Sequence, residues 1–144
     1  MDKKLYYVDT CIWLNLLKKE GDETKGIPYW KIAEEFLECV KRSEDIQVFV
    51  SIVVLRELAY LSNDKIKRSH LVSKCPTISF IQTGTEDYSI ARRIEKEHNY
   101  QLSFNDCLHI ALSMRLNAIL VTRDKELLEI GSRYIITKLP EELF

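Results

Sequence analysis

The chain has 144 residues, of which 46% are hydrophobic and 30% charged, and its 21 basic residues face 22 acidic ones. This is the composition of a globular domain of common size, and it argues against disordered, low-complexity or collagen-like structure. The net charge of −1 shows no basic excess of the kind that nucleic-acid and membrane-surface binding proteins usually carry, although it says nothing about where charges lie.

Residue patterns also argue against a membrane span, a signal peptide and a zinc site. The longest uninterrupted apolar runs, such as residues 52–55, are far shorter than the roughly 20 residues that cross a bilayer. The four cysteines form no C-x-x-C pair and stand at positions 11, 39, 75 and 107. We therefore expect a cytoplasmic protein with reduced thiols.

Apolar runs rich in strand formers alternate along the chain with segments of helical periodicity. In chain order we predict a strand over 5–8, helices over 12–17 and 28–42, a strand over 46–50, helices over 52–61 and 64–73, a strand over 77–81, helices over 85–98 and 104–116, a strand over 118–121, a helix over 125–130 and a strand over 134–136. This order predicts one α/β domain over residues 1–144, with a mainly parallel five-stranded sheet and helices on both faces.

Four acidic residues from separate segments are expected at one edge of this sheet. Asp9 ends the first strand, Glu57 follows the second, Asp106 opens the helix before the fourth, and Asp124 follows the fourth. Each has a structural alternative when taken alone: the three aspartates could cap helices, and Glu57 could form a salt bridge. Because ligands of open parallel sheets bind at the carboxyl ends of the strands, one shared site explains all four acids together.

Clustered carboxylates are typical ligands of hard cations. Mg²⁺ and Mn²⁺ prefer carboxylate and water oxygens and commonly engage substrate phosphates as well. Such a cluster can activate water and stabilise the leaving oxygen of a phosphodiester. The sequence contains no phosphate-binding glycine loop and no nucleophile elbow that would favour another chemistry.

The segments that carry these acids resemble the motifs of the PIN-domain family, small α/β nucleases that include the VapC-like toxins of VapBC toxin–antitoxin pairs. The resembling segments, in the family's order, are Tyr7–Thr10, Ser51–Leu58, Ser103–Leu112 and Leu120–Asp124. The resemblance implies a three-layer α/β/α sandwich and an Mg²⁺- or Mn²⁺-dependent endoribonuclease. Carried over by position, the metal-binding and catalytic residues would be Asp9, Glu57, Asp106 and Asp124, supported by Thr10 and Thr122. The implied partners are an RNA substrate, a cognate antitoxin and a second copy in a homodimer.

Other residues admit two interpretations. The basic stretch formed by Lys65, Lys67, Arg68 and Lys74 is either a solvated helix face or an RNA-backbone contact. We interpret His109 as a packed helix residue rather than a base. Aromatic residues in the first third of the chain are core anchors or part of a dimer face, and they are Trp13, Tyr29, Trp30 and Phe36.

Two other functions remain as alternatives. One is a catalytically silent PIN-like module that binds RNA or supports an assembly, although all four acids are present. The other is a phosphoryl-transfer domain of receiver or phosphatase type, which needs an acid pair where this chain reads Asp9-Thr10-Cys11. Without the four clustered acids, 18 acidic residues remain against 21 basic ones. We therefore expect an acidic pocket beside a basic rim.

Overall fold

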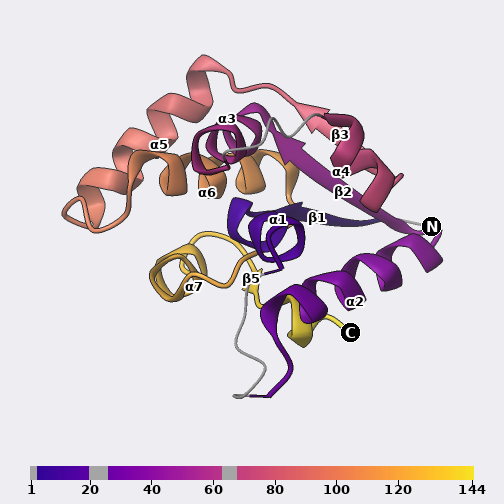
Figure 1. Ribbon diagram of the computed structural model, residues 1–144. Coiled ribbons are helices and arrows are strands. Elements are labelled where there is room, and N and C mark those ends of the chain that lie inside the picture. Colours follow the sequence, from indigo (N-terminus) through magenta and orange to yellow (C-terminus); the bar gives the residue numbers. More distant parts are fainter. Residues whose placement is uncertain (1–2, 20–25, 63–67) are drawn as a thin grey trace.

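A parallel sheet runs through the computed structural model, which describes residues 3–19, 26–62 and 68–144 (Figure 1). Within this part of the chain, the strands are β1 (Lys4–Val8), β2 (Ile46–Ser51), β3 (Ile78–Ile81), β4 (Ile119–Val121) and β5 (Thr137–Lys138). They lie in the order β3-β2-β1-β4-β5, and every neighbouring pair is parallel. The strand order therefore reverses between β1 and β4. A receiver-type sheet has the order 2-1-3-4-5, so the receiver form of the phosphoryl-transfer alternative does not fit this sheet.

Helices cover both faces of the sheet. The helices of the described residues are α1 (Thr10–Leu17), α2 (Tyr29–Arg42), α3 (Ile52–Leu61), α4 (Arg68–Lys74), α5 (Thr85–Glu97), α6 (Phe104–Leu116) and α7 (Lys125–Gly131), with a 3₁₀ turn, η2 (Pro140–Glu142). None of them is long and apolar enough to span a bilayer.

Two neighbouring tyrosines of β1 define the layers. Tyr6 packs on Phe36 of α2, with ring centroids 5.9 Å apart, and Tyr7 packs on His109 of α6 at 5.5 Å. Successive side chains of a strand point to opposite faces, so α2 and α6 lie on opposite sides of the sheet. This arrangement confirms the expected three-layer α/β/α sandwich.

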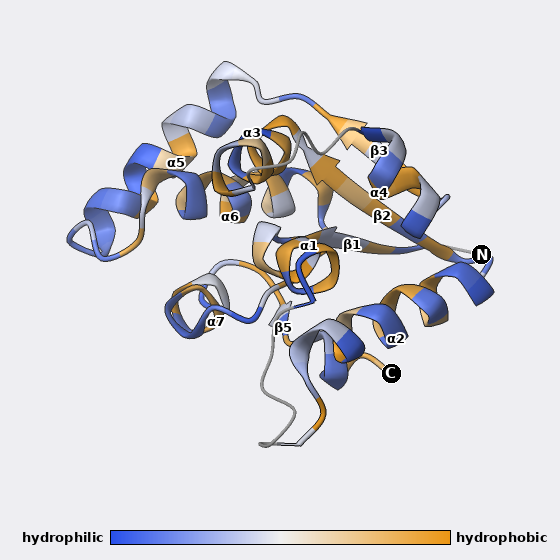
Figure 2. Cartoon of the chain, in the orientation of Figure 1, coloured by the Kyte–Doolittle hydropathy of each residue, from blue (hydrophilic) through white to orange (hydrophobic). Residues whose placement is uncertain are grey.

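Helix α6 is the central element of its layer. Every residue from 107 to 113 is buried, as expected for a helix that is packed on all sides. Helix α5 covers it and carries mostly hydrophilic residues, whereas β2 is strongly hydrophobic (Figure 2). Ser103 caps α6 by accepting a hydrogen bond from the Asp106 amide, and Asn117 ends it in the left-handed conformation at φ 51°. The packed core thus fixes the position of the side chains that α6 carries.

The structure moves the last predicted strand and leaves one predicted helix partly outside the described residues, while the other predicted boundaries shift by at most two residues. The last strand lies at Thr137–Lys138 rather than at 134–136, because residues 132–135 form a turn in which the amides of 133–135 bond back to the carbonyls of Ile130 and Gly131. Helix α5 begins at Thr85, as predicted, and Gly84 is its cap. Residues 64–67 of the predicted helix lie outside the described residues, and α4 begins at Arg68.

Three of the four early aromatic residues pack inside or against the fold. Trp13 and Phe36 are buried in the core, and Trp30 is partly buried. Tyr29 is 47% exposed, and the Arg123 guanidinium lies over its ring at 4.2 Å.

Asp87 is a buried charge that joins α5 to α6. Its carboxylate accepts from Arg115 Nε at 3.1 Å and from the Gly84 amide at 2.7 Å. Replacing Asp87 by Ala leaves both donors without this acceptor, so we expect the free energy of unfolding to fall by about 2–3 kcal/mol. Urea denaturation measures this loss, with Glu86→Ala in the exposed first turn as the matched control. Equal effects of the two substitutions would contradict the prediction.

Candidate active site

The switch point between β1 and β4 brings several acidic and polar residues together. Asp9 directly follows β1, and its amide donates to the carbonyl of Val121 at the end of β4 (2.9 Å). Thr122 comes next in the chain. Asp106 lies in the first turn of α6, which leads back to the start of β4, and Glu57 lies in the second turn of α3. The edge is therefore the one that the parallel topology predicts.

Asp9 is held in one orientation by three donors. The Thr10 amide donates to Oδ1 at 2.8 Å, the Thr122 hydroxyl to Oδ2 at 2.8 Å, and the Cys11 thiol to Oδ2 at 3.3 Å. Burial and the charge of Asp9 raise the pKa of the Cys11 thiol, so this thiol stays protonated. A carboxylate has about four acceptor positions, so the three bonds fix its direction and leave capacity for a cation.

Asp106 lies close to Asp9. One oxygen of each carboxylate and one nitrogen of His109 lie within 4.8 Å of one another, a grouping that could hold a metal ion. Burial raises the pKa of Asp106 to about 6, the charges of Asp9 and Asp124 add to the rise, and His109 opposes it. Like charges held together favour a bound cation, because it would relieve their repulsion.

Glu57 is joined to this group by two hydrogen bonds. Its Oε1 accepts from the Thr10 hydroxyl at 2.9 Å and lies 2.7 Å from His109 Nε2. Burial acts to raise the pKa of Glu57, but the bond and charge of His109 and the bond of Thr10 outweigh it, so the pKa is lowered. Glu57 therefore stays ionised at neutral pH.

His109 was interpreted from sequence as a packed residue, and it is packed, but it also belongs to the site. Its side chain is fully buried, with Nε2 beside Glu57 and 3.4 Å from Asp9 Oδ1, and Nδ1 2.6 Å from the Tyr7 hydroxyl. Burial acts to lower its pKa, yet the charge of Asp9 and the bond to Glu57 raise it. The sequence signal for this role was its position three residues after Asp106, on the same face of the helix.

Thr122 and Asp124 link the loop after β4 to the site. The Thr122 hydroxyl donates to Asp9 and accepts from the Asp124 amide at 3.1 Å. Asp124 Oδ1 accepts from the amides of Glu126 and Leu127, so this carboxylate caps α7. Asp124 thus realises its helix-cap alternative while its charge still acts on Asp106.

The basic stretch is only partly described. Lys65 and Lys67 lie outside the described residues. The Arg68 guanidinium lies 5.1 Å from the ring centre of Phe80 in β3, and Lys74 lines a hollow of about 140 Å³ beside α2. The structure therefore places Lys74 next to α2, in a hollow that none of the four acids lines.

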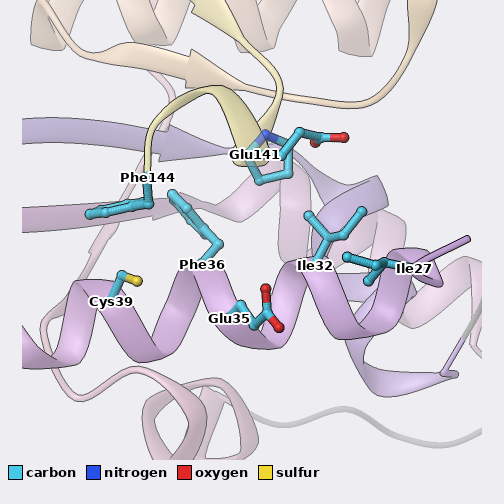
Figure 3. Close-up of a pocket in the computed structure, with 8 residues that line it drawn as sticks. Ile27, Ile32, Glu35, Phe36, Cys39, Glu141 and Phe144 are labelled. Atoms are coloured by element: carbon cyan, nitrogen blue, oxygen red, sulfur yellow. The ribbon is translucent and has the colours of Figure 1, made fainter.

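Two larger hollows differ in their relation to the carboxylates. One, of about 480 Å³, lies between α2 and the C-terminal segment, where Phe36, Cys39, Glu141 and Phe144 line it (Figure 3). None of the predicted site residues lines this hollow. The other, of about 470 Å³, has Glu57 in its wall, along with residues of α3 and of the start of α6. The second hollow therefore adjoins the site.

The sheet and site define an α/β protein with acidic side chains gathered at the switch point of a parallel sheet. The model of the PIN domain family, described as "PIN domain", matches residues 6–132, and the chain belongs to this family. No curated protein matches the chain in sequence.

Solved structures share the fold at low sequence identity. VapBC2 from Rickettsia felis, bound to a promoter DNA fragment, is 20% identical with a TM-score of 0.61, over 94% of this chain and 98% of that chain. A toxin–antitoxin complex from Klebsiella pneumoniae is 16% identical with a TM-score of 0.62, over 96% and 98%. VapBC-1 from nontypeable Haemophilus influenzae is 17% identical with a TM-score of 0.62, over 95% and 98%.

Proposed function

We propose that this chain is a VapC-like, metal-dependent endoribonuclease that hydrolyses RNA phosphodiester bonds at the edge of its sheet. The observation that carries the proposal is the placement of the Asp9 and Asp106 carboxylates together at the switch point. Asp9 is already oriented by three hydrogen bonds, so binding a cation would cost little reorganisation. Membership of the PIN domain family agrees with this chemistry.

The donor set fits Mg²⁺ or Mn²⁺. Asp9 and Asp106 offer hard carboxylate oxygens, and the raised pKa of Asp106 reflects its burial and, to a smaller extent, the nearby charges of Asp9 and Asp124. A divalent ion held there would acidify a water for attack on the phosphodiester and stabilise the charge of the leaving oxygen. Within this proposal, Glu57 and Asp124 complete the acidic group, while Thr10 and Thr122 hold Glu57 and Asp9 in place.

The surrounding backbone favours an anionic substrate. Helices α1, α3 and α6 all begin at the same edge, capped by Asp9, Ser51 and Ser103. The amino ends of helices carry partial positive charge, which helps to hold carboxylates and phosphates despite their mutual repulsion. We propose that the RNA backbone approaches through the hollow beside Glu57, where Arg56 supplies a positive charge. Of the basic stretch, Lys65, Lys67 and Arg68 stay candidate RNA-backbone contacts, whereas Lys74 lines a separate hollow beside α2.

A protein partner is part of the proposal. The structures from Klebsiella pneumoniae and Haemophilus influenzae are toxin–antitoxin complexes that share this fold, so we propose a cognate antitoxin for this chain. We also propose a homodimer, which light scattering would reveal as twice the chain mass of 16.9 kDa.

Metal dependence is the direct test. The purified chain is incubated with labelled structured RNA and with single-stranded DNA of the same sequence, with Mn²⁺, with Mg²⁺ and after chelation. We expect RNA cleavage that falls at least about 100-fold on chelation and returns when the ion is restored. The Asp9→Asn protein, prepared in parallel, reports any contaminating nuclease. Cleavage that persists after chelation would overturn the proposed function.

A further inference from the structure

A chain of hydrogen bonds runs beneath the carboxylates. Ser51 Oγ lies 2.6 Å from the Tyr7 hydroxyl, which lies 2.6 Å from Nδ1 of His109, whose Nε2 lies 2.7 Å from Glu57 Oε1. Ser51, Tyr7 and His109 are all fully buried. The chain begins at the residue that caps α3 and returns to Glu57 on the same helix, crossing β1 and α6 on the way.

The chemistry of the partners fixes the role of Nε2. Its two polar neighbours, Oε1 of Glu57 and Oδ1 of Asp9, belong to carboxylates, and an ionised carboxylate only accepts hydrogen bonds. Nε2 therefore carries a proton and donates, both in the neutral ring and in the charged one. Nδ1 is hydrogen-bonded to the Tyr7 hydroxyl in both states of the ring: it accepts from the hydroxyl when the ring is neutral and donates to it when the ring is charged.

These bonds conflict with metal binding by the ring. A metal-binding imidazole needs an unprotonated nitrogen directed at the ion. One nitrogen of His109 does lie within 4.8 Å of oxygens of Asp9 and Asp106, so distance alone would make it a third ligand. To become one, the ring would have to break its bond to Glu57 or to Tyr7 inside a packed core, where an unpaired polar group is costly.

We propose that His109 is a positioning residue that holds Glu57 and Asp9 in place and does not bind the metal. Its N–H lies between the two carboxylates and offsets their repulsion. Tyr7 and Ser51 fix the ring from behind. The metal site is then built of oxygen ligands, which suits Mg²⁺ and Mn²⁺ better than ions that favour imidazole. The catalytic consequence of this inference rests on the proposed function, whereas the hydrogen-bond assignment does not.

Spectroscopy of the unaltered chain tests the ligand question. With Mn²⁺ bound, electron spin-echo modulation reports any directly coordinated nitrogen, and we expect none. In the metal-free protein, long-range ¹H–¹⁵N spectra distinguish the three histidines, and the His109→Gln variant identifies the signals of His109. We expect a protonated Nε2 before and after Mg²⁺ is added. Coordinated nitrogen, or loss of that proton on Mg²⁺ binding, would overturn the proposal.

A pair of variants tests positioning. His109→Gln keeps an N–H donor near Nε2, and His109→Leu fills the space without one. We expect His109→Leu to weaken Mn²⁺ affinity about 10- to 100-fold, as loss of a group that orients ligands typically does, and His109→Gln to recover most of it. Equal affinity of His109→Leu and the unaltered chain would contradict positioning. If His109→Leu does not fold, Thr10→Val, which removes the other donor to Glu57, serves as the reference. An Mn²⁺ affinity of His109→Gln below that of Thr10→Val would then contradict the proposal.

None of these measurements uses RNA. If the chain binds Mn²⁺ as described but cleaves no RNA, the proposed function is refuted. The role of His109 is still decided by the spectra and the Mn²⁺ affinities.

Discussion

Replacing Asp106 by Asn is expected to abolish RNA cleavage and, at the same time, to stabilise the metal-free protein at neutral pH. Cleavage should fall at least about 1,000-fold, because the substitution removes a proposed ligand of the metal on which the chemistry depends. Stability should rise because burial, together with the charges of Asp9 and Asp124, raises the pKa of Asp106 to about 6 and makes its ionised form costly. Asn has the same shape and carries no charge.

The sign of the stability change depends on pH. The pKa of Asp106 is higher in the folded protein, at about 6, than its usual value of 3.8, so the folded state binds more protons between these pH values. The free energy of unfolding therefore falls as the pH rises through this window, and the full penalty is present above about pH 6. We expect Asp106→Asn to gain about 1–2 kcal/mol at pH 7, after allowance for solvent screening, and to lose this advantage near pH 3.5.

Urea denaturation in the presence of a chelator measures the effect at both pH values. Glu86→Gln, in the exposed first turn of α5, is the matched control for loss of one negative charge. A stabilisation that is the same at pH 7 and at pH 3.5, or that Glu86→Gln reproduces, would contradict the prediction.

Asp9→Asn offers a contrast, since it should remove cleavage equally but cost stability. Both Asp9 oxygens accept from donors: the Thr10 amide on one side and the groups of Thr122 and Cys11 on the other. An amide cannot accept on both sides, so one set of donors would face its NH₂ group. We expect a loss of about 1–2 kcal/mol, measured in the same denaturation series. A loss of stability in Asp9→Asn and a gain in Asp106→Asn, with equal loss of activity, would support this contrast: Asp9 is held by hydrogen-bond donors, whereas Asp106 is destabilised by burial of its charge.

The parallel α/β class and the sheet edge on which the acids lie were predictable because they follow from hydrophobic periodicity and chain order, whereas the strand order was not predicted. Apolar runs that end at an acid mark the carboxyl ends of strands, and parallel strands bring those ends to one edge. Glu57 stands out in the sequence because the residues one turn away on its face are apolar; of these, Val53 and Val54 are buried, whereas Tyr60 and Leu61 are 88% and 47% exposed. A charge in such a stripe needs partners, and the structure supplies them in Thr10 and His109.

Other parts of the site depended on contacts that no local pattern encodes. The role of His109 rests on hydrogen bonds between residues that are far apart in the chain. Tyr7 is 102 residues from His109 and 44 residues from Ser51. Whether Asp124 faces the other carboxylates or its own helix depends on the direction of one side chain, and in the structure its Oδ1 accepts from the amides at the start of α7. The last strand was predicted too early in the chain because the apolar run that begins at Tyr134 forms a turn after α7 and packs on the core without being a strand.

Binding of Mg²⁺ or Mn²⁺ should stabilise the folded chain, and this stabilisation should weaken as the pH falls through about 6. At a hundred times its dissociation constant, a ligand specific to the folded state adds about 2.7 kcal/mol. Below the pKa of Asp106, at about 6, the ion must displace a proton, so its apparent affinity falls by up to about tenfold per pH unit. At a fixed ion concentration, a drop from pH 7.5 to pH 5 should therefore remove about 1.4 kcal/mol of the stabilisation.

Denaturation with and without Mn²⁺ at the two pH values measures this linkage. Glu86→Gln should behave as the unaltered chain does, and Asp106→Asn should show little stabilisation by Mn²⁺ at either pH. Stabilisation of Asp106→Asn by Mn²⁺ equal to that of the unaltered chain would show that the ion binds without Asp106. The pairing of Asp9 with Asp106, which the described residues offer as a cation position, would then not be the site at which the ion binds.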